Sequence, residues 1–360
     1  MLAPRAEELG YLIFPAARKI GGFLCVGSIH GEPGQKFKIR LRGPKAGTWV
    51  DYGTSDSDPN GKGDAIKLVT LTLGNGDYAK GFAEVKRFLN LDTMDPAILT
   101  KRKDAAAKAA RRAEHLQLKD DEKRARGARD MWWSGAELTA SSPPIKYLAS
   151  RGIDFKQLGR LPRAIRYRHE LYHAELGRKV PAMVTAFTAL CGEHVGTHQT
   201  FLEFGKSGWG KVPKMMVKDK LEDVAKKIFG PVWDRGAHMP LWKGRHQCKL
   251  ADIPPGTPVY VSEGIEDGLS YAMADPTARI IAAGTLGLIG QVRLPPQAGD
   301  MIVLAQNDVK QRPIEQLEAA IRNQQERNRI EGVNRVVRTK RPPDGVGDWN
   351  DWLRELTGIA

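Results

Sequence analysis

The sequence has few cysteines and no long apolar run. Its three cysteines among 360 residues, Cys25, Cys191 and Cys248, are widely spaced and odd in number, so we expect no disulfide framework. No apolar stretch reaches the length of a membrane span, and the first residues are too polar for a secretory signal. These absences predict a cytoplasmic protein with no membrane partner.

Two common signatures are also missing. The glycine-rich stretch from Gly205 to Lys211 lacks the Walker A spacing, and Val212 follows its lysine where a Ser or Thr is needed. Cys25 and His30 have no Cys-x-x-Cys partner nearby, so the four ligands of a closed structural zinc site cannot be assembled. We therefore expect neither a built-in helicase motor of the P-loop kind nor a bound zinc.

The composition is that of a basic globular protein. Hydrophobic residues make up 41% of the chain and charged residues 27%, and the length is enough for two or three domains with real cores. The net charge is +14 and the sequence pI is about 9.6. This excess favours a polyanionic partner, either nucleic acid or nucleotide phosphates. A membrane surface is disfavoured because no long basic amphipathic helix is present.

Basic residues gather in two places. In the first, cations alternate with apolar residues at the period of a β-strand, which puts the cations on one face; they are Lys36, Lys38, Arg40 and Arg42. The second is a glycine-containing loop over residues 206–220, with Lys211, Lys214 and Lys218 as candidates for phosphate contact. Both patterns fit a nucleic-acid or nucleotide contact, and both also fit a solvated basic surface.

Acidic residues follow two apolar runs in the last third of the chain. Residues 259–261, 280–283 and 301–305 read as strands separated by helical segments, which predicts a parallel sheet covered on both faces. Glu263 follows the first run and Asp308 follows the third. The carboxyl ends of parallel strands meet at one edge, where chemistry collects, and paired carboxylates there suit a divalent cation such as magnesium. We expect a further helix over 313–332, with Arg322, Arg327 and Arg329 on its outer face, and a strand over 334–338.

This arrangement resembles the Toprim domain, the metal-dependent module of bacterial-type primases, topoisomerases and some nucleases. Three stretches carry the resemblance: Glu263-Gly264-Ile265-Glu266, Gln306-Asn307-Asp308 and Asp348-Trp349-Asn350-Asp351. The first and last are similar to those of phage and plasmid primase-like proteins. One position departs from the family pattern, because Gln306 stands where the first Asp of Asp-x-Asp is usual.

The resemblance implies a role for each acidic residue. Glu263 would act as the acid/base, Asp308 and Asp348 would anchor magnesium or manganese, and Asp351 would assist them. Gln306 could contribute at most an amide oxygen, so the departure would weaken metal binding. Asn307 could partly substitute as a neutral oxygen ligand.

The resemblance extends beyond the acidic stretches. Residues 1–95 are similar in layout to the N-terminal zinc-binding domain of bacterial-type primases, in a degenerate form without zinc. Residues 96–135 read as a charged helical linker, 136–255 as a primase-core-like mixed α/β region and 256–360 as the Toprim domain. The expected fold class is therefore α/β, with a C-terminal Toprim domain, a small α+β N-terminal domain and a helical linker.

The implied activity is that of a DNA primase. Such an enzyme makes short RNA primers from ribonucleoside triphosphates on single-stranded DNA, and a separate replicative helicase is a possible partner during phage or plasmid replication. Two alternatives stay open from the sequence. One is a nucleic-acid-binding accessory protein in which Gln306 marks a decayed site, and the other is a Toprim nuclease.

Overall fold

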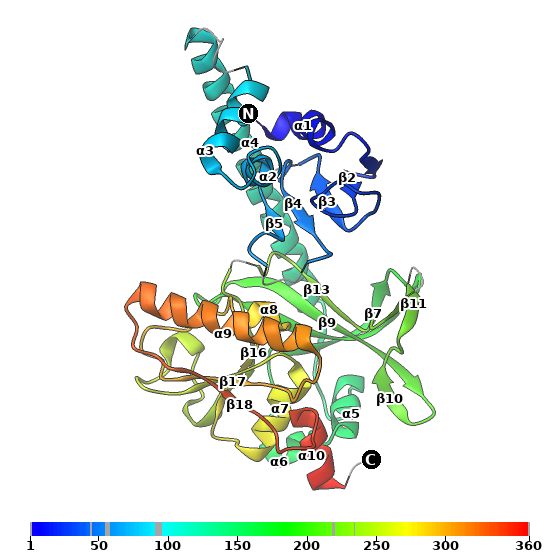
Figure 1. Cartoon of the computed structure of the whole chain (residues 1–360). Coiled ribbons are helices and arrows are strands. Elements are labelled where there is room, and N and C mark those ends of the chain that lie inside the picture. The colour runs from blue at the N-terminus through cyan, green and yellow to red at the C-terminus, as the bar shows by residue number, and fades with distance from the viewer. Residues whose placement is uncertain are drawn as a thin grey trace. The chain divides into compact units, whose positions relative to one another are not determined.

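The structure, a computed structural model, describes residues 2–43, 45–54, 58–90, 96–217, 220–233 and 235–358 (Figure 1). The chain divides into two compact units, Met1–Lys119 and Asp120–Ala360. Within the described ranges, no helix is both long enough and apolar enough to cross a membrane. The division into four domains expected from the sequence remains a prediction.

The first unit holds an antiparallel sheet and a set of helices. Its strands follow one another in sequence order: β1 (Arg18–Ile20), β2 (Phe23–Val26), β3 (Phe37–Arg40), β4 (Trp49–Asp51) and β5 (Lys62–Gly63). Its helical elements are η1 (Ala3–Arg5), α1 (Ala6–Ile13), α2 (Ala65–Thr72), α3 (Tyr78–Phe88) and the start of α4 (Pro96–Trp133), which continues into the second unit.

The alternating sequence of β3 produces the two faces that it predicts. Phe37 and Ile39 are buried in the core of the first unit, and Phe37 stacks on Trp49 of β4 with ring centroids 5.0 Å apart. Arg40 lies on the opposite, exposed side. α2 begins after Asp64, whose side chain accepts a hydrogen bond from the backbone N–H of Lys67, as expected for an N-cap residue. The strand expected from the alternation around residues 36–42 is confirmed.

The second unit contains a large antiparallel sheet. Its strands are β6 (Ala136–Glu137), β7 (Ile165–His173), β8 (Arg178–Thr188), β9 (His194–Gly205), β10 (Gly208–Lys211) and β13 (Lys226–Phe229), in the order β10-β9-β8-β7-β6 with β13 paired to β9. Also present are a small hairpin of β11 (Met215–Val217) and β12 (Lys220–Glu222), and the helical elements α5 (Pro143–Ser150), α6 (Phe155–Leu158), η2 (Gly244–His246) and η3 (Leu250–Asp252).

Successive residues of β8 enter two different cores. Met183 and Phe187 pack in the main core, which the two sheets of this unit share, whereas Ala182 and Val184 pack with Phe201 in a separate core on the other face. Because both faces are covered, β8 is apolar from Val180 to Phe187 except at the buried Thr185, instead of alternating with polar residues.

The second sheet of this unit is mostly parallel, as predicted. Its strands are β14 (Met239–Trp242), β15 (Val259–Ser262), β16 (Arg279–Ala282), β17 (Met301–Leu304) and β18 (Val337–Lys340), in the order β14-β16-β15-β17-β18, and only the edge strand β14 is antiparallel. The helices are α7 (Ile265–Ala274), α8 (Leu286–Ile289), α9 (Gln311–Glu331) and α10 (Trp349–Thr357).

Side chains in register on neighbouring strands give the parallel sheet two apolar faces. Val261 is level with Val303, and both belong to the main core together with Leu317 of α9. Tyr260, one residue earlier, points the other way and stacks on Tyr271 of α7 with ring centroids 4.8 Å apart. Figure 1 shows α9 as the long orange helix beside this sheet. The sheet is therefore covered on both faces, which explains its continuous apolar strands.

Two local expectations in this part of the chain are wrong. The last strand begins at Val337, three residues later than predicted, because it pairs there with Met301, the first residue of β17, while the Arg335 N–H donates locally to the Val333 carbonyl. The buried Arg335 guanidinium donates hydrogen bonds to the carbonyls of Pro295 and Gly299. Arg327 does not lie on the outer face of α9: it is half-buried and donates a hydrogen bond from Nη1 to the Val292 carbonyl, 2.9 Å away.

Candidate active site at the carboxyl edge of the parallel sheet

Glu263 and Asp308 lie at the same edge of the parallel sheet. Glu263 directly follows β15, and Asp308 follows the neighbouring strand β17. The backbone carbonyl of Glu263 accepts a hydrogen bond from the Gly284 N–H at 2.8 Å, which ties this position to the end of β16. Burial raises the pKa of the Glu263 carboxyl; the charge of Lys226 opposes the rise and that of Asp308 adds to it. The two predicted carboxylates therefore influence each other electrostatically.

A second group of polar side chains forms around Asp267, in the first turn of α7. Gln306 Nε2 donates a hydrogen bond to Asp267 Oδ2 at 2.8 Å. Burial, together with the nearby charge of Asp348, raises the pKa of Asp267 to about 7, although the bond from Gln306 opposes this rise. Gln306 stands where the first Asp of the family's Asp-x-Asp pattern is usual. Its side chain donates a hydrogen bond to the buried Asp267 carboxyl instead of adding a carboxylate of its own.

Asp348 and Asp351 begin α10. Asp348 Oδ1 accepts a hydrogen bond from the Asp351 N–H at 2.7 Å, so Asp348 is the N-cap of the helix. The Asp351 carboxylate lies 4.0 Å from the guanidinium of Arg151 and 3.9 Å from that of Arg354. Asp351 therefore faces two arginines as well as the loop that carries Asp348.

Asn307 connects the two loops that carry the acidic residues. Its side-chain Nδ2 donates to the Val346 carbonyl at 2.8 Å, and its backbone N–H donates to the Gly347 carbonyl at 2.8 Å. These bonds hold the loop after β17 against the loop before α10. The Asn307 amide nitrogen thus has a structural role in positioning Asp308 and Asp348.

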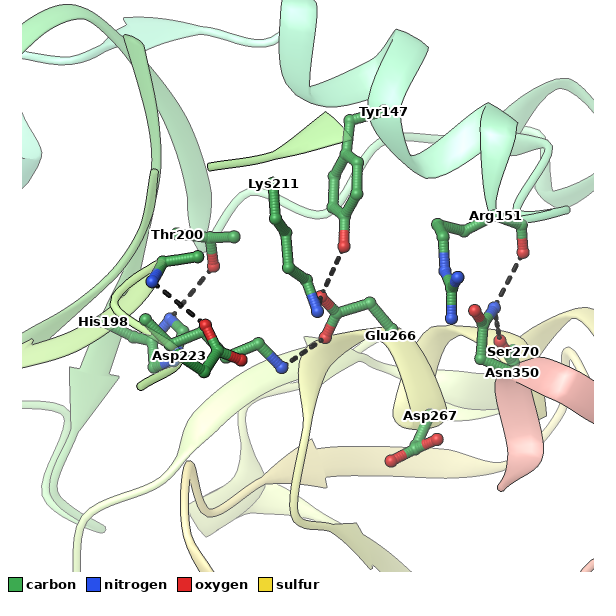
Figure 2. Close-up of polar contacts among 12 residues, drawn as sticks. Tyr147, Arg151, His198, Thr200, Lys211, Asp223, Glu266, Asp267, Ser270 and Asn350 are labelled. Atoms are coloured by element: carbon green, nitrogen blue, oxygen red, sulfur yellow. Dashed lines mark hydrogen bonds and ion pairs between the residues drawn. The ribbon is translucent and has the colours of Figure 1, made fainter. Parts of the chain in front are cut away.

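Glu266 forms a buried polar cluster, which Figure 2 shows beside Asp267. Its carboxylate lies 3.0 Å from Lys211 Nζ and 3.3 Å from Lys226 Nζ, and it accepts a hydrogen bond from the Tyr147 hydroxyl at 2.7 Å. Burial opposes ionisation, but Lys226, Lys211 and the Tyr147 hydroxyl together hold the pKa of Glu266 well below its usual range. This cluster joins α7 of the parallel sheet to α5, β10 and β13.

The predicted basic residues belong to both units of the chain. In the first unit, Lys38 Nζ lies 5.2 Å from the centre of the Tyr52 ring and Arg40 packs over Phe23, while the side chains of Lys36 and Arg42 are exposed. In the second unit, Lys211 pairs with Glu266 and Lys214 lies exposed after β10. Lys218 falls outside the described residues.

Three contributors to this edge were not assigned a role from the sequence: Glu266, Asp267 and Lys226. The first two lie within the Glu-Gly-Ile-Glu-Asp stretch, so their spacing on the first turn of α7 was a usable signal. Lys226 is on β13, 37 residues before Glu263 in the sequence. No local pattern could have brought it to the site, because its position depends on how the antiparallel sheet packs against α7.

The described side chains do not form a closed metal-binding group. Nowhere in the described ranges do three or more His, Cys, Asp and Glu side chains come together in an arrangement that could hold a metal ion. The donors at the edge are oxygens from Glu263, Asp308 and Asp348, which is the chemistry that magnesium or manganese prefers.

Two protein-family models match this chain, and one of them covers the parallel sheet. Residues 258–358 match the family model described as the Toprim domain, and residues 122–236 match a domain of unknown function (DUF7146). No curated protein matches the chain.

Several solved primase structures are similar at low identity. The primase of Aquifex aeolicus (zinc-binding and RNA polymerase domains) is 15% identical, with a TM-score of 0.35 over 98% of this chain and 84% of that one. The DnaG primase catalytic domain bound to ssDNA is 13% identical, with a TM-score of 0.38 over 67% of this chain and 78% of that one. The primase fragment of the bacteriophage T7 primase-helicase is 13% identical, with a TM-score of 0.35 over 63% and 77%.

The assignment rests on the family model and on the sheet itself. The matched range begins one residue before β15 and ends just after α10, so it spans the four parallel strands and both acidic loops. The carboxyl-terminal part of this chain, residues 258–358, is therefore a Toprim domain.

Proposed function

We propose that this protein is a primase-like nucleotidyltransferase that makes short RNA primers on single-stranded DNA, with magnesium or manganese, during replication of a phage or plasmid. The observation that carries the proposal is the placement of Glu263 and Asp308 at one edge of a Toprim sheet, close enough for the charge of Asp308 to raise the pKa of Glu263. Joining two nucleotides requires a proton acceptor and charge neutralisation at one place; Glu263 is the proposed acceptor, and a metal held by Asp308 and Asp348 would supply the neutralisation.

Each residue of the edge has a proposed part. Glu263 handles the proton of the attacking hydroxyl group. Asp308 and Asp348 would hold the metal, and Asp351 supports Asp348 through its backbone N–H. When bound, the metal supplies charge neutralisation at the phosphate oxygens. No zinc has a place in this scheme.

Basic residues supply the contacts for the substrates. Lys226 and Lys211 lie beside α7 and share one carboxylate, Glu266, so positive charge is left over that can neutralise the phosphates of a ribonucleoside triphosphate. Lys214 and Lys218 are proposed as further phosphate contacts on the basis of the sequence. The face of β3 that carries Lys38 would contact the phosphates of single-stranded DNA, together with Lys36, Arg40 and Arg42. Since the sequence has no P-loop, a separate helicase is the proposed source of DNA unwinding. The proposed compartment is the cytoplasm.

Primer synthesis tests the proposal directly. Purified protein is incubated with single-stranded DNA, labelled ribonucleotides and magnesium or manganese, beside Glu263→Gln and the exposed control Glu318→Gln. We expect short RNA products from the wild type and from the control. Loss of the proton acceptor in Glu263→Gln is expected to lower synthesis about a hundredfold or more.

Two other results would replace the proposal. The hydrogen bond between Gln306 and Asp267 favours a second candidate, because it fills the position of a missing carboxylate with a neutral donor. Intact DNA with no RNA product, while DNA binding is retained, would identify a nucleic-acid-binding accessory protein. Shortened DNA would identify a Toprim nuclease.

A further inference from the structure

A second candidate site lies in the same unit, away from the acidic edge. A cavity of about 840 Å³ opens between the end of α4, the loop before β7, the turn between β8 and β9, and β14. Trp132, Trp133 and Trp242 line it. Glu263, Asp308 and Asp348 do not. The volume lies within the range of small-molecule and cofactor sites.

The topology separates this cavity from the proposed active site. Trp242 on β14 is level with Ile280, near the amino end of the parallel strand β16. Glu263 follows the carboxyl end of β15, which runs parallel to β16. The cavity and the acidic residues are therefore at different ends of one sheet, so the cavity is not an extension of that site.

The walls of the cavity carry positive charge without matching negative charge. The described lining includes four cations, Arg129, Arg160, Arg163 and Lys243, and a single acidic side chain, Glu193. Among the described residues, none of the four cations takes part in an ion pair. His194, also on the wall, is neutral at pH 7, because burial and the charge of Arg129 lower its pKa to about 4. Unpaired cations around a cavity favour an anionic ligand.

The indole rings are held in place before any ligand binds. Trp132 Nε1 donates to the Ala164 carbonyl at 2.7 Å, and Trp242 Nε1 donates to the Pro276 carbonyl at 2.8 Å. The Arg166 guanidinium lies 4.3 Å from the centre of the Trp132 ring and 4.7 Å from that of Trp133. Trp133 nevertheless stays 59% exposed. Trp242 is buried, and the Arg160 guanidinium stacks on it 3.9 Å from the ring centre, so Trp132 and Trp133 are the rings left for a ligand. Aromatic rings that are held in place reduce the entropy lost on binding, as in a stacking platform.

From this combination we infer that the cavity binds a nucleotide of single-stranded nucleic acid, with the base on the rings of Trp132 and Trp133 and its phosphates at Arg129, Arg163 and Lys243. Base stacking on aromatic rings, with arginines and lysines along the backbone, is the general chemistry of single-strand binding. The cations come from three separate segments around the opening, an arrangement suited to successive phosphates of a chain. This inference does not depend on whether the acidic edge makes primers.

Equilibrium binding of a fluorescent oligo-dT to the full chain, in EDTA, tests the inference. Trp133→Ala removes the exposed ring with little effect on folding and should weaken binding about 5- to 100-fold. Arg163→Ala should lower the slope of log Kd against log salt concentration by about one. The matched controls are Tyr172→Ala, whose ring is 62% exposed outside the cavity, and Arg322→Ala on α9; both should bind like the wild type.

Photocross-linking locates the contact. An oligonucleotide carrying 5-iodouracil is expected to cross-link to Trp133 or Trp132, and the adduct should form equally well in Glu263→Gln. The inference is wrong if Trp133→Ala and Arg163→Ala both bind the oligonucleotide with wild-type affinity and cross-link to it as the wild type does, at residues outside the cavity. If ATP alone quenches the fluorescence of Trp133 while oligonucleotide affinity is unchanged in Trp133→Ala, the cavity takes a free nucleotide and the single-strand assignment is wrong.

Discussion

Glu263 and Glu266 are three residues apart, at the junction of β15 and α7, yet their surroundings are opposite. Glu266 is buried with two lysines and a tyrosine hydroxyl, which keep it ionised. Glu263 is half-buried and has a carboxylate neighbour in Asp308, and partial burial together with that charge raises its pKa. Glu266 therefore links elements of the fold through ion pairs and a hydrogen bond, whereas Glu263 is the candidate catalytic residue. The antiparallel sheet supplies the two lysines that pair with Glu266, whereas the parallel sheet places Asp308 near Glu263.

The largest effect on stability is expected from Glu266→Gln. Without the carboxylate, Lys211 and Lys226 face each other with no counter-charge. Breaking a buried pair typically costs 3–5 kcal/mol, and since both lysines are about one-third exposed we expect a loss of about 3 kcal/mol of unfolding free energy. Urea denaturation checks this, with the exposed Glu318→Gln as the control, for which a change below about 0.5 kcal/mol is expected. Equal midpoints for the two variants would show that the cluster is not stabilising.

Tyr147→Phe separates the hydrogen bond from the ion pairs. Its hydroxyl bonds a buried charged group, so its loss should lower the unfolding free energy by about 2 kcal/mol. The double variant with Glu266→Gln should lose less than the sum of the two single losses, because both act on one network. A strictly additive result would contradict the assignment of Tyr147 to this cluster.

Gln306→Asp examines the departure from the family pattern. The new carboxylate faces Asp267 without a donor, so in EDTA we expect the unfolding free energy to fall by about 1–2 kcal/mol. Magnesium should recover part of this loss, since a ligand that binds the folded state stabilises it. Thermal unfolding with and without magnesium provides the measurement. An identical magnesium shift in wild type and variant would mean that position 306 does not take part in metal binding.

Glu263→Gln should have the smallest effect on stability. It removes one of two neighbouring carboxylates at nearly constant volume, so we expect the unfolding free energy to stay within about 0.5 kcal/mol of wild type or to rise slightly. Urea denaturation beside Glu266→Gln completes the comparison. A loss as large as that of Glu266→Gln would falsify the division between a chemical and a structural glutamate.

Much of the Toprim domain, residues 258–358, could be predicted from local sequence. The apolar runs at 259–261, 280–283 and 301–305 became the parallel strands β15, β16 and β17, because runs apolar at every position suit strands that are covered on both faces. The carboxyl ends of adjacent parallel strands meet at one edge, so local pattern alone was enough to place Glu263 and Asp308 together. The buried face of β3 followed from the strand period in the same way.

Contacts between distant segments could not be predicted. Lys226 comes near Glu263 and Glu266 only because β13 pairs with β9 and the antiparallel sheet packs on α7. The tryptophan-lined cavity likewise combines α4, β8, β9 and β14, none of which carries a recognisable motif alone. Local periodicity was enough to place the strands β15, β16 and β17 and the carboxylates that follow β15 and β17, because a run of apolar residues is visible within each segment. Tertiary packing decided which charges became paired and which stayed free, because pairing depends on distances that no local pattern encodes.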